Sequence, residues 1–361
     1  MIPKEKTMKL GICTGGGDCP GLNSAIRAMV THGIRNYGME FFGIRDCLKG
    51  LFTKPCRFIP LHLEQVSSIF DKGGTILGTE NSGNPLMTAQ GEAYFKATKQ
   101  GFEDLGLDAL VIIGGEGTQG MCAQLSERGL PVIGIPKTID YDLPGTEETI
   151  GFSTCIDVVT DAVERLQSTA ESHDRLMVLE VMGRDSGFIA LHGGLAGGAH
   201  VILIPEIEFD IDVLVQHINE RKAMGWNYSV LVVSEGSREK NQDATYLNTE
   251  GSHKRLGGIG QRVAEKLEAK THMETRVTVL GHIQRGGSPN ARDRIIASEF
   301  AVYAVDLAAK KQFNQLVVRQ ENRITHISYS DIIYLKRRKI ENDDVTLKTA
   351  ESMGISFGRQ A

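Results

Sequence analysis

The sequence lacks the features that mark several classes of protein. Its 361 residues include a single tryptophan, and its six cysteines form no CxxC pair and no metal-ligand spacing. No apolar stretch approaches the roughly 18 residues that a membrane-spanning helix needs, and no charged leader with an apolar segment opens the chain. We therefore expect reduced thiols, no membrane partner and a cytoplasmic location.

Positive charge is scarce as well. The formal net charge is −5, which gives none of the positive surface that a nucleic acid would need, so we expect no nucleic-acid partner. The one basic cluster, Lys336-Arg337-Arg338-Lys339, is followed by acidic residues at Glu341, Asp343 and Asp344. This mixture of charges favours a solvated surface segment over a polyanion site.

Two polar motifs each follow an apolar run. Leu110–Ile113 and Val132–Ile135 are typical of buried parallel strands, and open α/β sheets bind ligands where such strands end. The motif at 114–118, GGEGT, offers glycine backbone and a carboxylate, which suit polyphosphate and Mg²⁺. The motif at 136–142, PKTIDYD, offers two carboxylates, which suit a general base and its support. Together they predict phosphoryl transfer to a hydroxyl group.

Strands and helices are predicted to alternate along most of the chain. The length favours two lobes, and the alternation predicts an α/β fold with parallel sheets. A glycine-rich turn at 15–21 suits either an anion site at a helix amino terminus or simple packing. The predicted strands are 9–14, 110–113, 132–135, 176–181, 201–204, 228–234 and 275–280. The predicted helices begin near residue 23 and span 117–128, 154–171, 187–195, 212–223 and 291–310.

Six motifs, in order and spacing, resemble those of the phosphofructokinase family. They are GGDCPGLN at 16–23, GGTILG at 73–78, GGEGT at 114–118, PKTIDYD at 136–142, MGR at 182–184 and GHIQRGGSP at 281–289. The resemblance implies two Rossmann-like lobes with mainly parallel sheets and the active site in the cleft between them. It implies a donor lobe of residues 8–150 plus about 283–325, and a fructose 6-phosphate lobe of 151–282 plus the C-terminal segment.

The same resemblance implies the acceptor residues. Asp140 matches the general base for the 1-hydroxyl of fructose 6-phosphate, with Asp142 beside it, and Arg184 matches the arginine that stabilises the transferring phosphoryl group. Arg175 and Arg276 match residues that reach into a neighbouring subunit's site, which implies a homodimer or homotetramer. The remaining matches to fructose 6-phosphate contacts are Thr138, Ile139, Met182, Gly183, Glu235, His282, Ile283, Gln284 and Arg285.

The donor residues implied by the resemblance give two signals. Glu116 replaces the usual aspartate as the residue for Mg²⁺. Gly117 is typical of family members that use ATP, whereas Lys137 is typical of many that use pyrophosphate. This combination marks a mixed-substrate group, for which we expect ATP and keep pyrophosphate as the alternative. The matched donor positions are Gly16, Gly115, Glu116, Gly117, Thr118 and Lys137.

Several positions depart from the family pattern. Asn81 stands where an arginine usually contacts the donor phosphates, and Tyr141 stands where asparagine is usual. The missing arginine leaves a sugar-phosphate-binding pseudokinase with a regulatory role as an alternative from another class. The usual ADP and phosphoenolpyruvate pocket has also lost its cations, so we expect neither compound to regulate through it. The replaced positions are Thr31, Gln167, His200, Met224 and Trp226.

Overall fold

The computed structural model describes residues 7–81, 83–243, 246–248, 255–332 and 335–360. The chain divides into two compact units, each built from segments far apart in the sequence. Unit 1 contains residues up to Ile139, Leu143–Thr154 and Arg285–Arg337. Unit 2 contains Asp140–Asp142, Cys155–Gln284 and the chain from Arg338 onward. The triplet Asp140–Asp142 therefore belongs to unit 2, although the strand before it belongs to unit 1.

Unit 1 is built on a sheet with the strand order β14-β13-β5-β4-β1-β2-β3, and β6 pairs with β5. The pairs in the middle are parallel, whereas β2 with β3 and β13 with β14 are antiparallel. The central order β3-β2-β1-β4-β5 is that of a Rossmann sheet. The strands are β1 (Lys9–Gly15), β2 (Glu40–Ile44), β3 (Phe58–Leu61), β4 (Ala109–Gly114), β5 (Val132–Thr138), β6 (Ile150–Gly151), β13 (Gln315–Gln320) and β14 (Arg323–Ser328).

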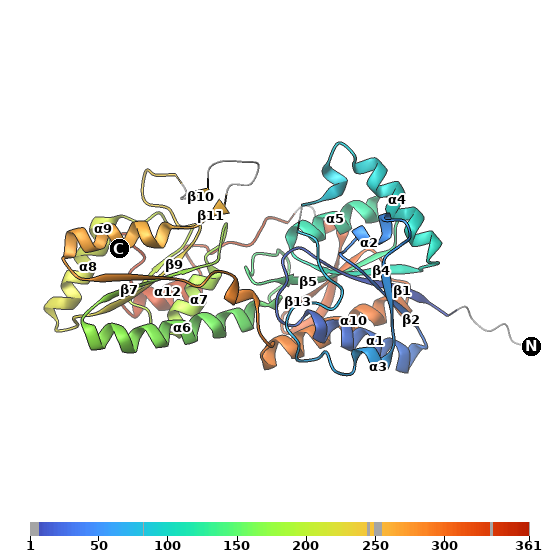
Figure 1. The fold of residues 1–361 in the computed structure, drawn as a ribbon, viewed down its shortest axis with the longest axis horizontal. Helices are drawn as coiled ribbons and strands as arrows, with labels where there is room; N and C mark the ends of the chain where they lie inside the picture. The colour runs from blue at the N-terminus through green and yellow to red at the C-terminus, as the bar shows by residue number, and fades with distance from the viewer. Residues whose placement is uncertain (1–6, 82, 244–245, 249–254, 333–334, 361) are drawn as a thin grey trace, which may run out of the picture. The chain divides into compact units, whose positions relative to one another are not determined.

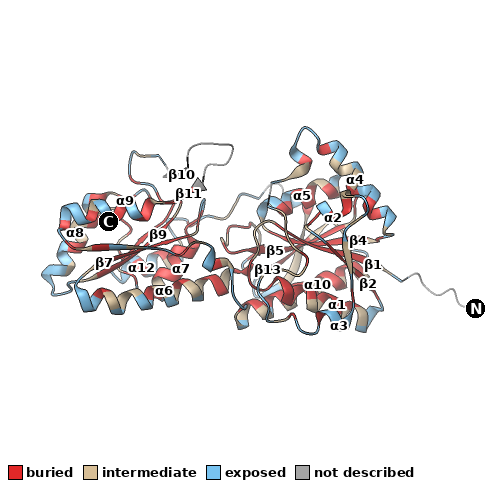
Figure 2. Ribbon diagram, in the orientation of Figure 1, coloured by how far each residue is buried: buried red, intermediate tan, exposed pale blue. Residues whose placement is uncertain are grey.

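Helices cover both faces of this sheet (Figure 1). One face carries α1 (Leu22–Tyr37), α3 (Leu63–Val66) and α10 (Ala291–Ala309). The other carries α2 (Lys49–Phe52), α4 (Gly91–Asp104) and α5 (Glu116–Glu127). Every residue of β4 and β5 is buried, as the red strands in Figure 2 show, because helices lie on both of their faces. Short helices η1 (Pro85–Met87) and α11 (Tyr329–Ile332) complete the unit.

Unit 2 is built on a parallel sheet with the order β12-β7-β9-β8. Side chains from its strands pack with those of α8 and α9 into a core cluster. The strands are β7 (Leu176–Val181), β8 (Val201–Leu203), β9 (Ser229–Ser234), β12 (Thr275–Val279) and the small pair β10 (Tyr246–Asn248) and β11 (Arg255–Leu256). The helices are α6 (Phe152–His173), α7 (Phe188–Ala196), α8 (Ile211–Ala223), α9 (Ile259–Thr271), η2 (Gly281–Arg285) and α12 (Val345–Ser352).

The predicted α/β fold with mainly parallel sheets is confirmed, and individual elements match closely. The strand predicted at 176–181 is β7, and the helix predicted at 291–310 is α10. Sequence reasoning did not identify the antiparallel hairpin β13–β14 or the C-terminal helix α12. No helix in the described part of the chain is both long enough and apolar enough to cross a membrane.

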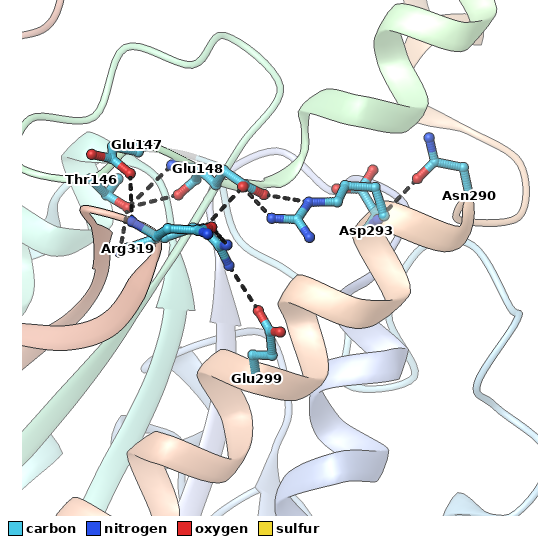
Figure 3. Close-up of polar contacts among 9 residues, drawn as sticks. Thr146, Glu147, Glu148, Asn290, Asp293, Glu299 and Arg319 are labelled. Atoms are coloured by element: carbon cyan, nitrogen blue, oxygen red, sulfur yellow. Dashed lines mark hydrogen bonds and ion pairs between the residues drawn. The ribbon is translucent and has the colours of Figure 1, made fainter.

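A polar network fixes the loop that returns from the base motif to α6 (Figure 3). Asp293, which is 0% exposed, accepts hydrogen bonds from the amides of Gly151 and Thr154, both at 2.8 Å. Arg319 of β13 forms ion pairs with Glu148 at 3.2 Å and with Glu299 at 3.1 Å. Since these partners come from three separate segments of unit 1, the network joins the loop to α10 and the hairpin.

Candidate active site

Three neighbouring strands of unit 1 bring the first set of predicted residues together. In the parallel register Gly15 of β1 lies opposite Gly114 of β4, and Gly114 lies opposite Pro136 of β5. The loops that follow these strands therefore leave the same edge of the sheet. The strand order reverses direction between β1 and β4, which is where Rossmann sheets bind nucleotides and other ligands.

The loop after β1 approaches Lys137 closely. Gly16 adopts a left-handed backbone with φ of +76°, and its amide donates to the carbonyl oxygen of Glu80 at 3.0 Å. Lys137, only 3% exposed, donates from Nζ to the carbonyl oxygen of Gly17. A Cβ added at Gly16 would lie 3.5 Å from both Lys137 Nζ and Thr118 Oγ1. Gly16, Lys137 and Thr118 are thus neighbours, as the predicted donor site requires.

Helix α5 begins at the end of β4 and presents its amino terminus at this edge. Gly115 is the N-cap residue, and Glu116 and Gly117 are the first two residues of the helix, both exposed. Unpaired amides and the helix dipole at such an end favour anions. A Cβ added at Gly117 would meet open space among the described residues. A side chain at this position would therefore begin in open space near the start of α5.

Two arginines also lie in unit 1 near these loops. Arg337 donates from Nη2 to Oε2 of Glu116, so the predicted Mg²⁺ residue is held in an ion pair. Arg285 donates from Nη1 to the carbonyl oxygen of Asp18 at 3.2 Å. The structure thus places Arg285 beside the glycine loop, whereas its predicted partners His282 and Gln284 belong to unit 2.

The base motif continues into unit 2. Tyr141 has a left-handed backbone with φ of +59°, which turns the chain between Asp140 and Asp142. Ser186 donates from Oγ to the carbonyl oxygen of Asp140 at 3.0 Å, and the amide of Arg338 donates to that of Asp142 at 2.9 Å. The backbone carbonyls at both ends of the triplet therefore accept hydrogen bonds from other residues of unit 2.

Two neighbouring strands of unit 2 carry the residues that face this triplet. Val181 at the end of β7 lies opposite Ser234 at the end of β9, and the amide of Glu235 donates to the carbonyl oxygen of Val181 at 2.8 Å. Gly183 has a φ of +131°, and a Cβ there would lie 2.4 Å from Ser234 Oγ. Glycine is thus required where the loop bearing Arg184 passes the end of β9.

The pKa of Glu235 is shifted by the charges of Asp140 and Arg184. Burial raises the pKa of the Glu235 carboxyl above its usual value, and the negative charge of Asp140 raises it further. The Arg184 guanidinium acts in the opposite direction and lowers the pKa. Glu235 therefore lies within electrostatic reach of both Asp140 and Arg184. Two carboxyl groups and one guanidinium make a site suited to hydroxyl binding, proton removal and phosphate charge.

The other predicted acceptor residues lie on the short helix η2 and at the end of β5. Gln284 is 0% exposed and accepts from the amide of Met182 at 3.2 Å, so it braces the loop after β7. His282 and Ile283 are exposed on the short helix η2. Thr138 is the last residue of β5, and Ile139 follows it; both are buried. The carbonyl oxygen of Thr138 accepts a hydrogen bond from the Thr149 hydroxyl at 2.8 Å.

Arg175 and Arg276 lie at the opposite end of the unit 2 sheet. Arg175 precedes β7 and Arg276 lies near the start of β12, whereas Gly183 and Glu235 follow the carboxyl ends of β7 and β9. A six-residue strand is about 20 Å long. Both arginines pair with Glu274, Arg175 at 2.8 Å. The structure of one chain therefore separates these two arginines from Arg184 and Glu235.

Two contacts of the basic cluster were not expected from the sequence. Lys336 and Lys339 are exposed, in keeping with a surface segment. Arg337, however, pairs with Glu116, and the Arg338 guanidinium lies over the Tyr141 ring at 4.3 Å. Charge pattern alone gave no signal of either contact, because the partners are some 200 residues away in the sequence.

The residues of the expected effector pocket make other contacts. Gln167 donates from its amide to the carbonyl oxygens of Gly197 at 2.6 Å and Gly198 at 2.9 Å, where α7 ends. His200 accepts the amide of Val230 on Nδ1 at 2.9 Å, and burial together with the charge of Arg221 lowers its pKa to about 4. Thr31 is a residue of α1 in unit 1.

Met224 and Trp226 follow α8, and both are exposed. The guanidinium of Arg221 lies over the Trp226 ring at 4.9 Å. This cation therefore already has an aromatic partner.

Comparison with known proteins identifies the class and then the family. The two α/β units, one of them with a Rossmann strand order, place the chain in the class of Rossmann-like α/β proteins. The sequence profile described as Phosphofructokinase matches residues 9–308, and the chain belongs to the phosphofructokinase family.

The similar proteins are named for two different phosphoryl donors. An ATP-dependent 6-phosphofructokinase of Chloroflexus aggregans is 45% identical over 98% of this chain and 99% of its own length. A pyrophosphate–fructose 6-phosphate 1-phosphotransferase of Streptomyces coelicolor is 41% identical over 97% of this chain and 100% of its own length. The solved T-state phosphofructokinase of Pichia pastoris superposes with a TM-score of 0.80 at 28% identity, over 91% of this chain and 36% of that chain.

Proposed function

We propose that this chain is a 6-phosphofructokinase, which transfers the γ-phosphoryl group of ATP to the 1-hydroxyl of fructose 6-phosphate in glycolysis. The observation that carries the proposal is that Glu235, after the end of β9, lies within electrostatic reach of both Asp140 and Arg184 in unit 2. Similarity to relatives named 6-phosphofructokinase over almost the whole chain supports it. The cytoplasmic location, supported by six free thiols, belongs to the same proposal.

Each of the three groups has a distinct role in the proposed reaction. Asp140 accepts the proton of the 1-hydroxyl as its oxygen attacks the phosphoryl group. Arg184 offers a planar guanidinium to the charge that develops on the phosphoryl oxygens. Glu235 binds sugar hydroxyls, and its neighbours Met182 and Gly183 supply backbone on the same side. Asp142 supports the base through the turn that Tyr141 makes.

The donor is proposed to bind at the carboxyl edge of the unit 1 sheet. Gly16, Gly115 and Thr118 line this edge, and the start of α5 favours phosphate. Open space at Gly117 supports ATP, because nothing there crowds a nucleotide. Buried Lys137, held against the Gly17 carbonyl, supports the alternative donor pyrophosphate. We retain ATP as the donor, because steric exclusion decides the choice more firmly than the added charge of Lys137, and Gly117 presents no steric barrier to a nucleotide.

The chain fits the Mg²⁺ ion that this chemistry uses. Mg²⁺ keeps several waters and is bound by one or two carboxylates together with substrate phosphates. Glu116 is the proposed residue, at the start of α5 where donor phosphates would bind. Among the described residues, no three His, Cys, Asp or Glu side chains form a metal-holding group, as a shared phosphate–protein site allows. Bound Mg²⁺ would neutralise phosphate charge.

Arg175 and Arg276 are proposed to complete the 6-phosphate site of a neighbouring copy. Their place at the amino end of the unit 2 sheet supports this, because Arg184 and Glu235 lie beyond its carboxyl end. His282 and Ile283 are proposed contacts of the chain's own sugar phosphate, with Gln284 as their buried support. Arg285 is also a proposed contact of fructose 6-phosphate. In this structure its guanidinium donates to the carbonyl oxygen of Asp18, in the loop after β1.

A parallel assay tests this function. Purified protein is supplied with fructose 6-phosphate and Mg²⁺ and either ATP or pyrophosphate, and formation of fructose 1,6-bisphosphate is measured. Turnover with ATP supports the proposal. Turnover with pyrophosphate and not with ATP would show that pyrophosphate is the donor. Binding of fructose 6-phosphate without turnover on either donor would establish the pseudokinase alternative.

A further inference from the structure

We propose that Arg338 and Tyr141 form a clamp that positions the base motif, so that the C-terminal segment contributes to catalysis. The inference rests on the proposed function, since it concerns how Asp140 is held. Tyr141 stands between Asp140 and Asp142 with a left-handed φ of +59°. A residue with a side chain holds this conformation only where its surroundings fix it.

The surroundings of Tyr141 are aromatic and cationic. Its ring meets Phe188 edge to face, with centroids 5.4 Å apart, and meets His192 at 6.1 Å. The Arg338 guanidinium lies 4.3 Å from the centre of the Tyr141 ring and 5.0 Å from that of Phe188. Two rings therefore share one cation, an arrangement that is favourable and directional.

The backbone of Arg338 adds a second contact to the same motif. Its amide donates to the carbonyl oxygen of Asp142 at 2.9 Å, so one residue contacts both the ring and the backbone of the triplet. The far side of the triplet is fixed by Ser186, which donates to the carbonyl oxygen of Asp140. These contacts restrain the motif on both sides of Tyr141.

The segment that carries Arg338 is itself anchored in unit 2. The amide of Ile340, a buried residue, donates to Oε1 of Glu206 at 3.2 Å. The same oxygen accepts the amide of Gly187 at 3.1 Å, immediately before Phe188 begins α7. Glu206 thus joins the C-terminal segment to the start of the helix that supplies the Phe188 ring. Arg338 is therefore a positioning residue on a segment that is fixed two residues further along the chain.

A double-mutant cycle tests the clamp. We expect Arg338→Ala and Tyr141→Ala each to lower kcat roughly 10- to 100-fold, the scale of a small misplacement of a catalytic group. The KM for fructose 6-phosphate should change little, because neither residue is among the proposed sugar-phosphate contacts. The double variant should be no worse than the poorer single variant, since both changes break one unit. Lys336→Ala, an exposed charge of the same segment, should leave kcat unchanged.

A second comparison applies if an alanine variant fails to fold. Tyr141→Phe keeps the ring and should retain most activity, whereas Tyr141→Leu keeps apolar bulk without a ring face and should not. Arg338→Lys keeps the cation and should recover part of kcat. Losses that multiply in the double variant, or equal activity of the phenylalanine and leucine variants, would overturn the proposal. An inactive wild type would instead contradict the proposed function itself.

Discussion

The charge of Asp140 raises the pKa of Glu235, a carboxyl group that burial already keeps from ionising easily. Asp140 reaches this position from the loop after β5, and Glu235 from the end of β9. Placing two carboxyl groups within electrostatic reach destabilises the fold wherever both are ionised. Two carboxyl groups that destabilise the fold in this way, with the exposed Arg184 acting on one of them, are typical of a functional site.

The raised pKa of Glu235 predicts how its removal affects stability. The folded state binds this proton more tightly than the unfolded chain, so stability falls as pH rises from the usual value of 4.5 through the folded pKa. Glu235→Gln removes the charge, and we expect it to raise Tm at neutral pH while weakening fructose 6-phosphate binding. Below pH 4.5 the gain should disappear.

Thermal unfolding at the two pH values checks this, with Glu268→Gln as an exposed control from the same unit. A gain in Tm that is equal at both pH values would contradict the electrostatic explanation.

Gly117 is predicted to admit the nucleotide. Gly117→Asp places bulk and negative charge in the open space before α5, so we expect ATP-dependent kcat/KM to fall at least about tenfold more than pyrophosphate-dependent kcat/KM. Gly120→Asp is a matched control, because Gly120 also faces open space, one turn further along the same helix. Equal effects of Gly117→Asp on both donors would show that this residue does not select the donor.

Arg276 is predicted to act in a neighbouring copy's site. Mixing Arg276→Ala chains with Asp140→Asn chains should restore activity above that of either variant alone, because some hybrid sites would then be wholly wild type. Subunit exchange is verified by differently tagged chains. If the hybrids form and activity stays at the level of the separate variants, each chain builds its own site.

The order of the elements and much of the candidate site could be predicted from the sequence. Apolar runs ending in glycine or carboxylate motifs located β4, β5 and the loop of Asp140, since strand length and buried pattern are local properties. The contacts of Arg337 and Arg338 could not be predicted, because they join a C-terminal segment to loops far away in the sequence. The order of the motifs likewise does not reveal that Arg285 belongs to unit 1 while Gln284, the residue before it, belongs to unit 2.

Control by the usual effectors is predicted to be absent. The Gln167 amide is occupied by two backbone carbonyls, and His200, with its pKa lowered to about 4, is neutral at physiological pH. A polyphosphate needs several cations, each charge-assisted hydrogen bond contributing about 1.5–3 kcal/mol. Fructose 6-phosphate saturation curves should not change when ADP or phosphoenolpyruvate is added. Sigmoidal curves relieved by ADP, and lost in His200→Ala, would refute this.

The most direct test of the account is the rate of Asp140→Asn. Asparagine keeps the size of the side chain and cannot accept the hydroxyl proton, so we predict that kcat falls about 10²- to 10⁴-fold with the KM for fructose 6-phosphate little changed. Asp174→Asn, an exposed change elsewhere in unit 2, should behave as wild type. A kcat for Asp140→Asn within a few-fold of wild type would contradict the role of Asp140 as general base.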